Sequence, residues 1–325
     1  MRKGLATASV LACALITGWS AADAPATLSI ATSPVTTAAI DSAPALTATP
    51  SFDASVFDAP EVERVALTSR DRIVRVPDEP QWNALPVVAD DAKAMLEQLV
   101  TAERAVRDPA VTGTQLAFMG HLQQLVYRRL IERADLRDRV FSAIPQDLRG
   151  AADLNIAAGA DLWLFGPVAR KDLPDWRIVS APPINDLLRY YQEAQAEFSV
   201  PWYYLAAINL VETRMGRIRG DSYAGAQGPM QFMPKTWDAY GEGDINDAHD
   251  AILAAGRYLS AVGAPAKMER AIWMYNHDHE YVDAVMKYAA VMKADPSAFR
   301  GYYGWQVYFV TAGGTFLLPE GWSKD

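Results

Sequence analysis

Apolar residues recur every three or four positions over most of the chain from Leu85 onward. Clear examples are Met95, Leu96, Leu99, Leu116, Met119, Leu122, Val282, Val285 and Ala289. This period places the residues on one face of an α-helix, whereas half-buried strands alternate every two residues. No sustained alternation of the second kind occurs between residues 85 and 175. The pattern therefore predicts an all-α fold.

Helix-breaking residues divide this body into helices of ordinary length. They are Asp108-Pro109, Gly113, Pro145 and Gly166-Pro167. A proline-containing segment, residues 173–183, then separates two helical parts. We expect a helical N-terminal region over residues 85–180 and a second helical domain over residues 181–325.

Composition limits the classes of function. Half of the 325 residues are hydrophobic, which is enough for a packed core, and the formal net charge is −9. An acidic chain does not supply the basic surface that binding to nucleic acid requires, so a nucleic-acid partner is not expected. The single cysteine, Cys13, excludes an intrachain disulfide and any multi-cysteine metal centre.

The first 22 residues have the pattern of a secretory signal peptide. Arg2 and Lys3 precede the mostly apolar residues 5–19, which are followed by the small residues Ser-Ala-Ala at 20–22. We expect an exported protein of the cell envelope or exterior, cleaved before Asp23. The alternatives are an uncleaved N-terminal membrane anchor and a lipoprotein modified at the cysteine in this run.

Residues 23–84 form the next segment. From residue 23 to about residue 60, Ala, Thr, Pro and Ser dominate, and large apolar side chains are too few to build a core. The composition predicts a disordered linker. Within it, residues 70–76 (RDRIVRV) are either an isolated strand or more linker.

Glu212 is the first candidate for chemistry. Leu205, Ile208 and Glu212 lie at i, i+3 and i+7, so the carboxyl group shares a helix face with aliphatic side chains. Removal from water raises the pKa of a carboxyl group, which suits a general acid near neutral pH. The alternative is a structural ion pair with an arginine at 214, 217 or 219.

Two further segments carry groups that could bind a polar ligand. Residues 225–234 (GAQGPMQFMP) combine glycines with apolar residues and the amide of Gln231, and could line a groove beside Glu212. Tyr275 and Asn276 offer a phenol and an amide at a predicted helix end. The alternatives are core packing for the apolar side chains of the loop and a helix cap at Asn276.

A metal centre is not expected. The cluster His249, Asp250, His277, Asp278 and His279 lacks a zinc-binding His spacing. The acidic run at residues 244–250 (DINDAHD) lacks the loop glycine and distal glutamate of a calcium loop. A helix N-cap at Asn246 or Asp247 explains this run more simply.

Taken together, the motifs resemble those of bacterial lytic murein transglycosylases. The resemblance rests, in order, on residues 211–216 (VETRMG), 223–234 (YAGAQGPMQFMP), 244–252 (DINDAHDAI) and Tyr275-Asn276. The first is most similar to the membrane-bound type B branch, and Met230-Gln231 is also similar to the soluble enzymes. Thr213 departs from the serine that many soluble members have after the glutamate.

The resemblance implies a lysozyme-like catalytic domain over residues 181–325 and peptidoglycan glycan strands as the substrate. It implies that Glu212 is the sole catalytic acid/base, that Gln231, Tyr275, Asn276, Met230 and Tyr223 bind the substrate, and that no cofactor is needed. Glu212 would cleave the bond between N-acetylmuramic acid and N-acetylglucosamine with formation of a 1,6-anhydro ring. Ordinary glycoside hydrolysis uses a second carboxylate, which an internal hydroxyl nucleophile makes unnecessary.

Two other classes of function remain open on the sequence. One is a hydrolytic muramidase on the same fold, in which Asp221 or Asp244 acts as the base for water. The other is an inactive glycan-binding protein of the envelope. The presence of Glu212 together with its loop disfavours the second, and the lack of a second carboxylate in a recognised motif disfavours the first.

The N-terminal pattern leads to a direct prediction. The exported protein is expected to begin near Asp23, as determined by N-terminal sequencing of the secreted chain. A retained Met1, or a lipid on Cys13, would instead establish an anchored protein.

Overall fold

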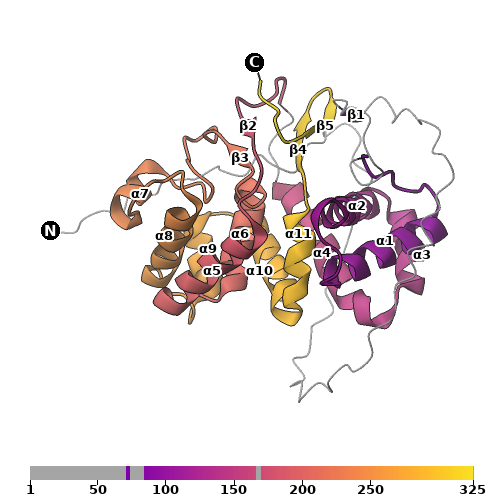
Figure 1. Cartoon of the computed structure of the whole chain (residues 1–325), viewed down its shortest axis with the longest axis horizontal. Coiled ribbons are helices and arrows are strands. Elements are labelled where there is room, and N and C mark those ends of the chain that lie inside the picture. Colours follow the sequence, from indigo (N-terminus) through magenta and orange to yellow (C-terminus); the bar gives the residue numbers. More distant parts are fainter. Residues whose placement is uncertain (1–70, 74–83, 166–169, 325) are drawn as a thin grey trace, which may run out of the picture.

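The computed structural model describes residues 71–73, 84–165 and 170–324 of the chain. These residues form mainly helices, with a few short strands at one side of the molecule (Figure 1). The prediction of an all-α fold is confirmed. Residues 1–22, and most of the predicted linker at 23–84, lie outside the described residues. Among the described helices, none is long and apolar enough to cross a membrane.

The front half consists of helices α1 (Ala92–Arg107), α2 (Gly113–Glu132), α3 (Ala134–Ala143) and α4 (Gln146–Phe165). Helix α1 begins at a capped end, where the Asp91 carboxylate accepts hydrogen bonds from the backbone of Lys93 and Ala94, each at 3.0 Å. The predicted apolar positions Met95, Leu99 and Met119 are fully buried.

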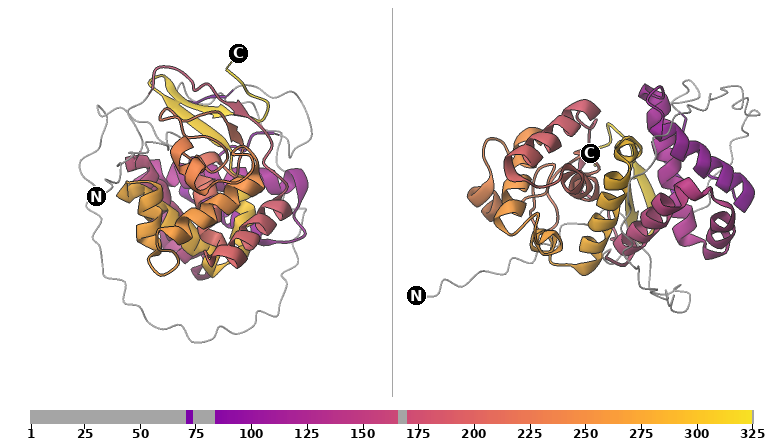
Figure 2. Two further views of the ribbon diagram at one scale, coloured as in Figure 1. Left: turned by 90° about the vertical axis from the view of Figure 1, so that its left-hand side faces the viewer. Right: turned by 90° about the horizontal axis from the view of Figure 1, so that it is seen from below.

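The second half begins after a short extended segment and contains the remaining helices. These are α5 (Ile184–Phe198), α6 (Trp202–Thr213), α7 (Pro234–Tyr240), α8 (Ala248–Ala261), α9 (Met268–Tyr275), α10 (His279–Ala294), the 3₁₀ turn η3 (Pro296–Ala298) and α11 (Phe299–Tyr303). The two groups of helices lie side by side, with α10 and α11 between them (Figures 1 and 2).

Short strands form two small sheets. Strands β4 (Val307–Thr311) and β5 (Gly314–Leu318) make an antiparallel hairpin, and β1 (Asp71–Ile73) adds to β5 in parallel. Strands β2 (Arg177–Ile178) and β3 (Ile218–Arg219) form an antiparallel pair. The stretch at 70–76 thus contributes a strand of a three-stranded sheet rather than an isolated one. The hairpin was not predicted, because every residue of β4 is buried and shows no alternation.

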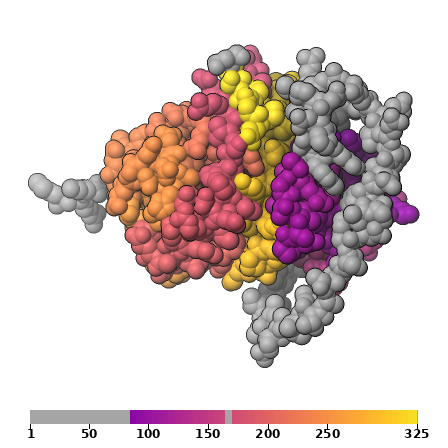
Figure 3. All heavy atoms as spheres, in the orientation of Figure 1, coloured from indigo at the N-terminus to yellow at the C-terminus, as the bar shows by residue number. Residues whose placement is uncertain are grey.

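One apolar core runs through both halves. Buried residues of α1, α2 and α4 belong to the same contact cluster as those of α6, α8 and α10. A second cluster, around Trp176, Ile218 and Phe309, lies under the strands. The domain boundary near residue 180 remains a prediction, and the helices on its two sides pack on each other. Figure 3 shows the C-terminal segment in yellow, between the two groups of helices.

Close backbone contact and polar side chains join the two halves. A Cβ at Gly120 in α2 would lie 2.6 Å from the carbonyl oxygen of Gly301 in α11, so only glycine permits this approach. The Tyr302 hydroxyl donates to Asn155 Oδ1 at 2.6 Å, and Trp305 Nε1 donates to Gln123 Oε1 at 3.0 Å. These contacts fix the orientation of α11 and of the residues that follow it relative to the front helices.

A buried carboxylate lies at the same junction. Glu103 of α1 is fully buried and accepts hydrogen bonds from Gln123 at 2.9 Å, from Tyr127 and from Arg107. Arg107 also donates to Asp295 at 2.6 Å, which extends the network to the end of α10. A buried charge is tolerated only when it is paired and hydrogen-bonded, as it is here.

We expect Glu103→Ala to lower the free energy of unfolding by about 3–5 kcal/mol, because it leaves buried donors without their acceptor. The matched control is Arg104→Ala on the same helix, since Arg104 pairs with Asp147 at 3.2 Å with both side chains exposed. That change should cost less than about 1 kcal/mol. Urea denaturation followed by circular dichroism measures the unfolding free energy of both variants. An equal loss in the two variants would contradict a stabilising role for the Glu103 network.

Candidate active site

Helix α6 carries Glu212 into the interior of the second half. Every residue from 205 to 213 is buried, and Glu212 itself is 1% exposed. This part of the helix is enclosed by its neighbours on all faces, so the carboxyl group near its end is enclosed as well. Such a group needs hydrogen-bond donors held in place by other elements.

Tyr281 supplies one donor. Its hydroxyl lies 2.7 Å from Glu212 Oε1, and its ring is fully buried at the start of α10. The Asp278 side chain caps this helix by accepting from the Tyr281 backbone at 3.1 Å. Tyr281 carries no signal in the sequence that links it to Glu212, because the two residues are 69 positions apart and no local pattern joins them.

A set of polar contacts holds the end of α6 against the glycine-containing loop. The Thr213 hydroxyl donates to the Pro229 carbonyl at 2.5 Å, and Asn209 Nδ2 donates to the same oxygen at 2.8 Å. The Tyr191 hydroxyl donates to Asn209 Oδ1 at 2.7 Å. Thr213 also accepts from the Gly216 backbone at 3.0 Å. The hydroxyl of Thr213, whose role was open on the sequence, therefore braces the loop.

The loop needs glycine at residue 228. Gly228 has a φ of +72°, and a Cβ there would overlap the carbonyl oxygen of Ile245. The backbone of Gln227 and Phe232 exchanges two hydrogen bonds, of 2.8 and 2.9 Å, which closes the turn. Gln231 inside the turn has a φ of +50°, and its side chain donates to the Gly228 carbonyl at 2.9 Å. Left-handed backbone at a non-glycine residue is strained and is often found at functional sites.

Tyr275, at the end of α9, joins this group. Its hydroxyl donates to the Met230 carbonyl at 2.6 Å. Burial raises the pKa of Tyr275 well above its ordinary value of 10, and the negative charge of Glu212 raises it further. The phenol therefore stays protonated and remains a donor. The side chain of Met230 is fully buried in the core, so this residue meets Tyr275 through its backbone.

Asn276 is 2% exposed, and within the described part of the chain its Nδ2 group has no hydrogen-bond partner. A buried donor without an acceptor costs free energy, so its presence indicates a position kept for another purpose. The predicted cap at this residue is formed by its backbone, which donates to Ile272 at 3.0 Å. Tyr223, by contrast, lies on the surface and is 53% exposed.

Two of the three arginines proposed as ion-pair partners of Glu212 have hydrogen-bond partners elsewhere, and the third, Arg214, donates to the Leu210 carbonyl of α6. Arg217 donates to the Tyr303 carbonyl at 2.9 Å, and Arg219 donates to the Asn246 carbonyl at 2.7 Å. Asp221 and Asp244 are exposed. Asp221 accepts from the Gln227 side chain at 3.2 Å.

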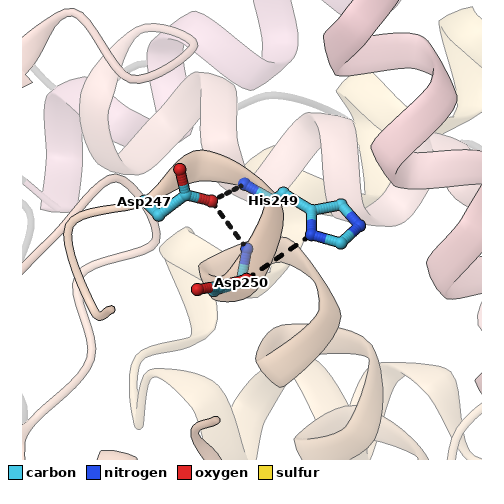
Figure 4. Close-up of side chains that lie close together, drawn as sticks. All are labelled: Asp247, His249 and Asp250. Atoms are coloured by element: carbon cyan, nitrogen blue, oxygen red, sulfur yellow. Dashed lines mark hydrogen bonds and ion pairs between the residues drawn. The ribbon is translucent and has the colours of Figure 1, made fainter. Parts of the chain in front are cut away.

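The acidic run at residues 244–250 forms a helix start (Figure 4). Of the two residues predicted as the N-cap, Asn246 and Asp247, it is Asp247 that caps α8, and it accepts from the backbone of His249 and Asp250 at 2.8 and 3.1 Å. Asp247, His249 and Asp250 have potential ligand atoms within 4.8 Å of one another. His249 Nε2, however, lies 2.8 Å from the Glu193 carboxylate, so this ring joins α8 to α5. The arrangement is explained by capping and helix packing.

Comparison with known proteins gives one partial match. The chain is 28% identical, over 124 residues, to the membrane-bound lytic murein transglycosylase F of Thiobacillus denitrificans. The match covers 36% of this chain and 26% of that protein, so the chain spans about a quarter of the relative's length. No family model matches the chain, and no solved structure matches it. The match supports a relationship to lytic murein transglycosylases and assigns no branch among them.

Proposed function

We propose that this chain is a peptidoglycan lytic transglycosylase with Glu212 as its single general acid and base. The observation that carries the proposal is the buried Glu212 carboxyl group, hydrogen-bonded by Tyr281 beside a loop that α6 itself braces. The partial relationship to a lytic murein transglycosylase supports the same reaction class. The substrate is the glycan strand, cleaved between N-acetylmuramic acid and N-acetylglucosamine.

The reaction needs one group that first gives and then takes a proton. Glu212 protonates the glycosidic oxygen, and the bond from C1 of the muramic sugar to that oxygen breaks. The N-acetyl group of the substrate stabilises the cationic C1. The 6-hydroxyl of the same sugar attacks C1 and returns its proton to Glu212, which closes a 1,6-anhydro ring without consuming water. An oriented internal hydroxyl has a large advantage over water in effective concentration.

The surrounding residues hold the groups that react. Tyr281 fixes the carboxyl group of Glu212 through Oε1, so the proton is delivered in one direction. The protonated Tyr275 holds the loop backbone at Met230, and Gln231 turns the chain there. The buried Nδ2 of Asn276 is a donor for the bound sugar. Tyr223, which precedes Met230 in the loop, offers an exposed ring to the substrate.

The proposal includes a place in the cell. The relative is a membrane-bound protein, and the pattern at residues 1–22 favours export. We therefore propose an envelope enzyme, anchored or secreted, that acts on glycan strands. Residues 181–325 would form its lysozyme-like catalytic domain, and residues 85–180 would support it through the shared core.

The hydrolytic alternative makes a different product. A muramidase would use Asp221 or Asp244 to activate water, and its reducing ends would be heavier than anhydro ends by about 18 Da, the mass of one water molecule. In that case Asp221→Asn or Asp244→Asn would damage activity nearly as much as a change at Glu212. Both carboxylates are exposed, in contrast to Glu212.

Glu212→Gln is expected to abolish cleavage while leaving the fold intact, because the amide keeps the shape of the side chain and transfers no proton. The expected loss is at least about 10²–10⁴-fold, since one group serves in both halves of the reaction. Mass spectrometry of digested peptidoglycan measures the products, which should carry 1,6-anhydromuramic ends. Glu197→Gln, an exposed change on α5, is the control. Reducing ends as the sole product would exclude the transglycosylase, and activity in the Glu212→Gln variant would exclude the site.

Tyr281→Phe is expected to lower kcat by about tenfold to a hundredfold with little change in KM. It removes a hydrogen bond to a charged group, which is worth about 1.5–3 kcal/mol. The control is Tyr288→Phe on the same helix, because the Tyr288 hydroxyl has no hydrogen bond within the described residues. Steady-state kinetics and thermal melting of both variants test the role. Equal kcat values in the two variants would contradict it.

A further inference from the structure

Arg170 contacts Tyr223, which precedes Met230 and Gln231 in the same loop, from a distant part of the chain. Its backbone is held at the end of β4, where its carbonyl oxygen accepts from the Ala312 backbone at 2.6 Å. Its guanidinium carbon lies 3.5 Å from the centroid of the Tyr223 ring. A guanidinium group held this closely over a ring face is attracted to the ring and can still use its N–H groups to bind a ligand.

Within the described part of the chain, the guanidinium group of Arg170 has no carboxylate partner. Among the described residues, no ion pair or side-chain hydrogen bond involves it, and its Nε is buried without an acceptor. The pair lies at the surface, since Tyr223 is 53% exposed and Arg170 is partly exposed. A fixed, partly buried cation that is paired with a ring and not with an anion is ready to accept an anion.

The position of Tyr223 ties this cation to the proposed active site. Tyr223 belongs to the loop that also carries Met230 and Gln231. The Trp176 side chain holds the start of this loop by donating to the Asp221 carbonyl at 3.3 Å. The Ser222 hydroxyl holds its turn by accepting from the Ala226 backbone at 2.9 Å. Arg170 is therefore attached to a well-ordered part of the loop.

The strand pair from which this loop leaves adds a second observation. Arg177 of β2 and Arg219 of β3 are directly opposite each other in the antiparallel pair. Like charges at such positions destabilise a sheet. The pKa of Arg219 is lowered by burial and by the charge of Arg177, which reflects this repulsion. A chain with a net charge of −9 thus keeps two opposed cations on the strand pair from which the loop leaves.

We propose that Arg170, stacked on Tyr223, binds a carboxylate carried by the muramic acid units of the glycan strand. The inference rests on the proposed function and adds a substrate contact to it. Each muramic unit bears a lactyl group whose carboxyl is joined to a peptide. The carboxylates of that peptide, or the free lactyl carboxylate where the peptide is missing, have the same binding chemistry. A guanidinium group binds either with two parallel hydrogen bonds.

The test compares three glycan substrates. Peptide-bearing strands carry carboxylates in the peptide, and strands stripped by an amidase carry them at the lactyl group. Stripped strands whose lactyl carboxyl is converted to an amide carry none. Arg170→Ala should raise KM about tenfold on the carboxylate-bearing strands, with kcat unchanged, and should have no effect on the amidated strands. The glycan substrate on which the KM of Arg170→Ala rises shows whether the bound carboxylate belongs to the peptide or to the lactyl group.

Matched variants distinguish the loss of a specific carboxylate contact from a general loss of positive charge. Arg139→Ala removes one exposed positive charge from α3 and should leave KM unchanged on all three substrates. Arg170→Lys keeps the charge and loses the planar fork, so its KM should lie between those of the native protein and the Arg170→Ala variant. Tyr223→Ala should reproduce the Arg170→Ala effect, and the double variant should show no further loss, because the two residues act as one unit.

The results that test the carboxylate site are separate from the results that test the proposed transglycosylase reaction. Anhydro products from the native protein on any of the three substrates support the transglycosylase regardless of Arg170. A KM rise confined to carboxylate-bearing strands supports the carboxylate site. An equal rise on all three substrates, or no rise on any of them, overturns it. Thermal melting of each variant verifies that the loop remains folded.

Discussion

The carboxyl group of Glu212 is enclosed at the end of a helix that is buried on every side, and the rest of the site follows from this constraint. A carboxyl group in that position needs donors that do not move. Tyr281 provides one from the first turn of α10. Helix α10 packs against both α6 and α4, so the donor is held in position by the second half and by the front half together.

The same principle organises the loop opposite Glu212. The carbonyl oxygen of Pro229 accepts from Thr213 and Asn209, and the carbonyl of Met230 accepts from Tyr275. Three side chains from two helices therefore bind consecutive peptide groups of one loop. This arrangement stabilises a backbone in which Gln231 has a left-handed conformation. The side chain of Gln231 itself bonds within the turn, to the Gly228 carbonyl.

Local patterns were sufficient where the relevant interactions are local. The periodicity at Met95, Leu99 and Met119 predicted buried helix faces, and a cap was predicted at Asn246 or Asp247, because both features depend on residues no more than four positions apart. The hairpin of β4 and β5 escaped detection because β4 is covered on both sides. The role of Thr213 was also open, since its acceptor, Pro229, lies 16 positions away.

The sequence by itself determined that the chain is helical and that Glu212 shares a face with aliphatic residues, because helical period and composition are properties of short segments. It also placed Gln231, Tyr275 and Asn276 in motifs that resemble one family. Only the tertiary structure decided which groups contact one another: Tyr281 with Glu212, Tyr275 with Met230, and Arg170 with Tyr223. These pairs are 45 to 69 positions apart. Contacts across such separations depend on how whole helices pack, which no short pattern encodes.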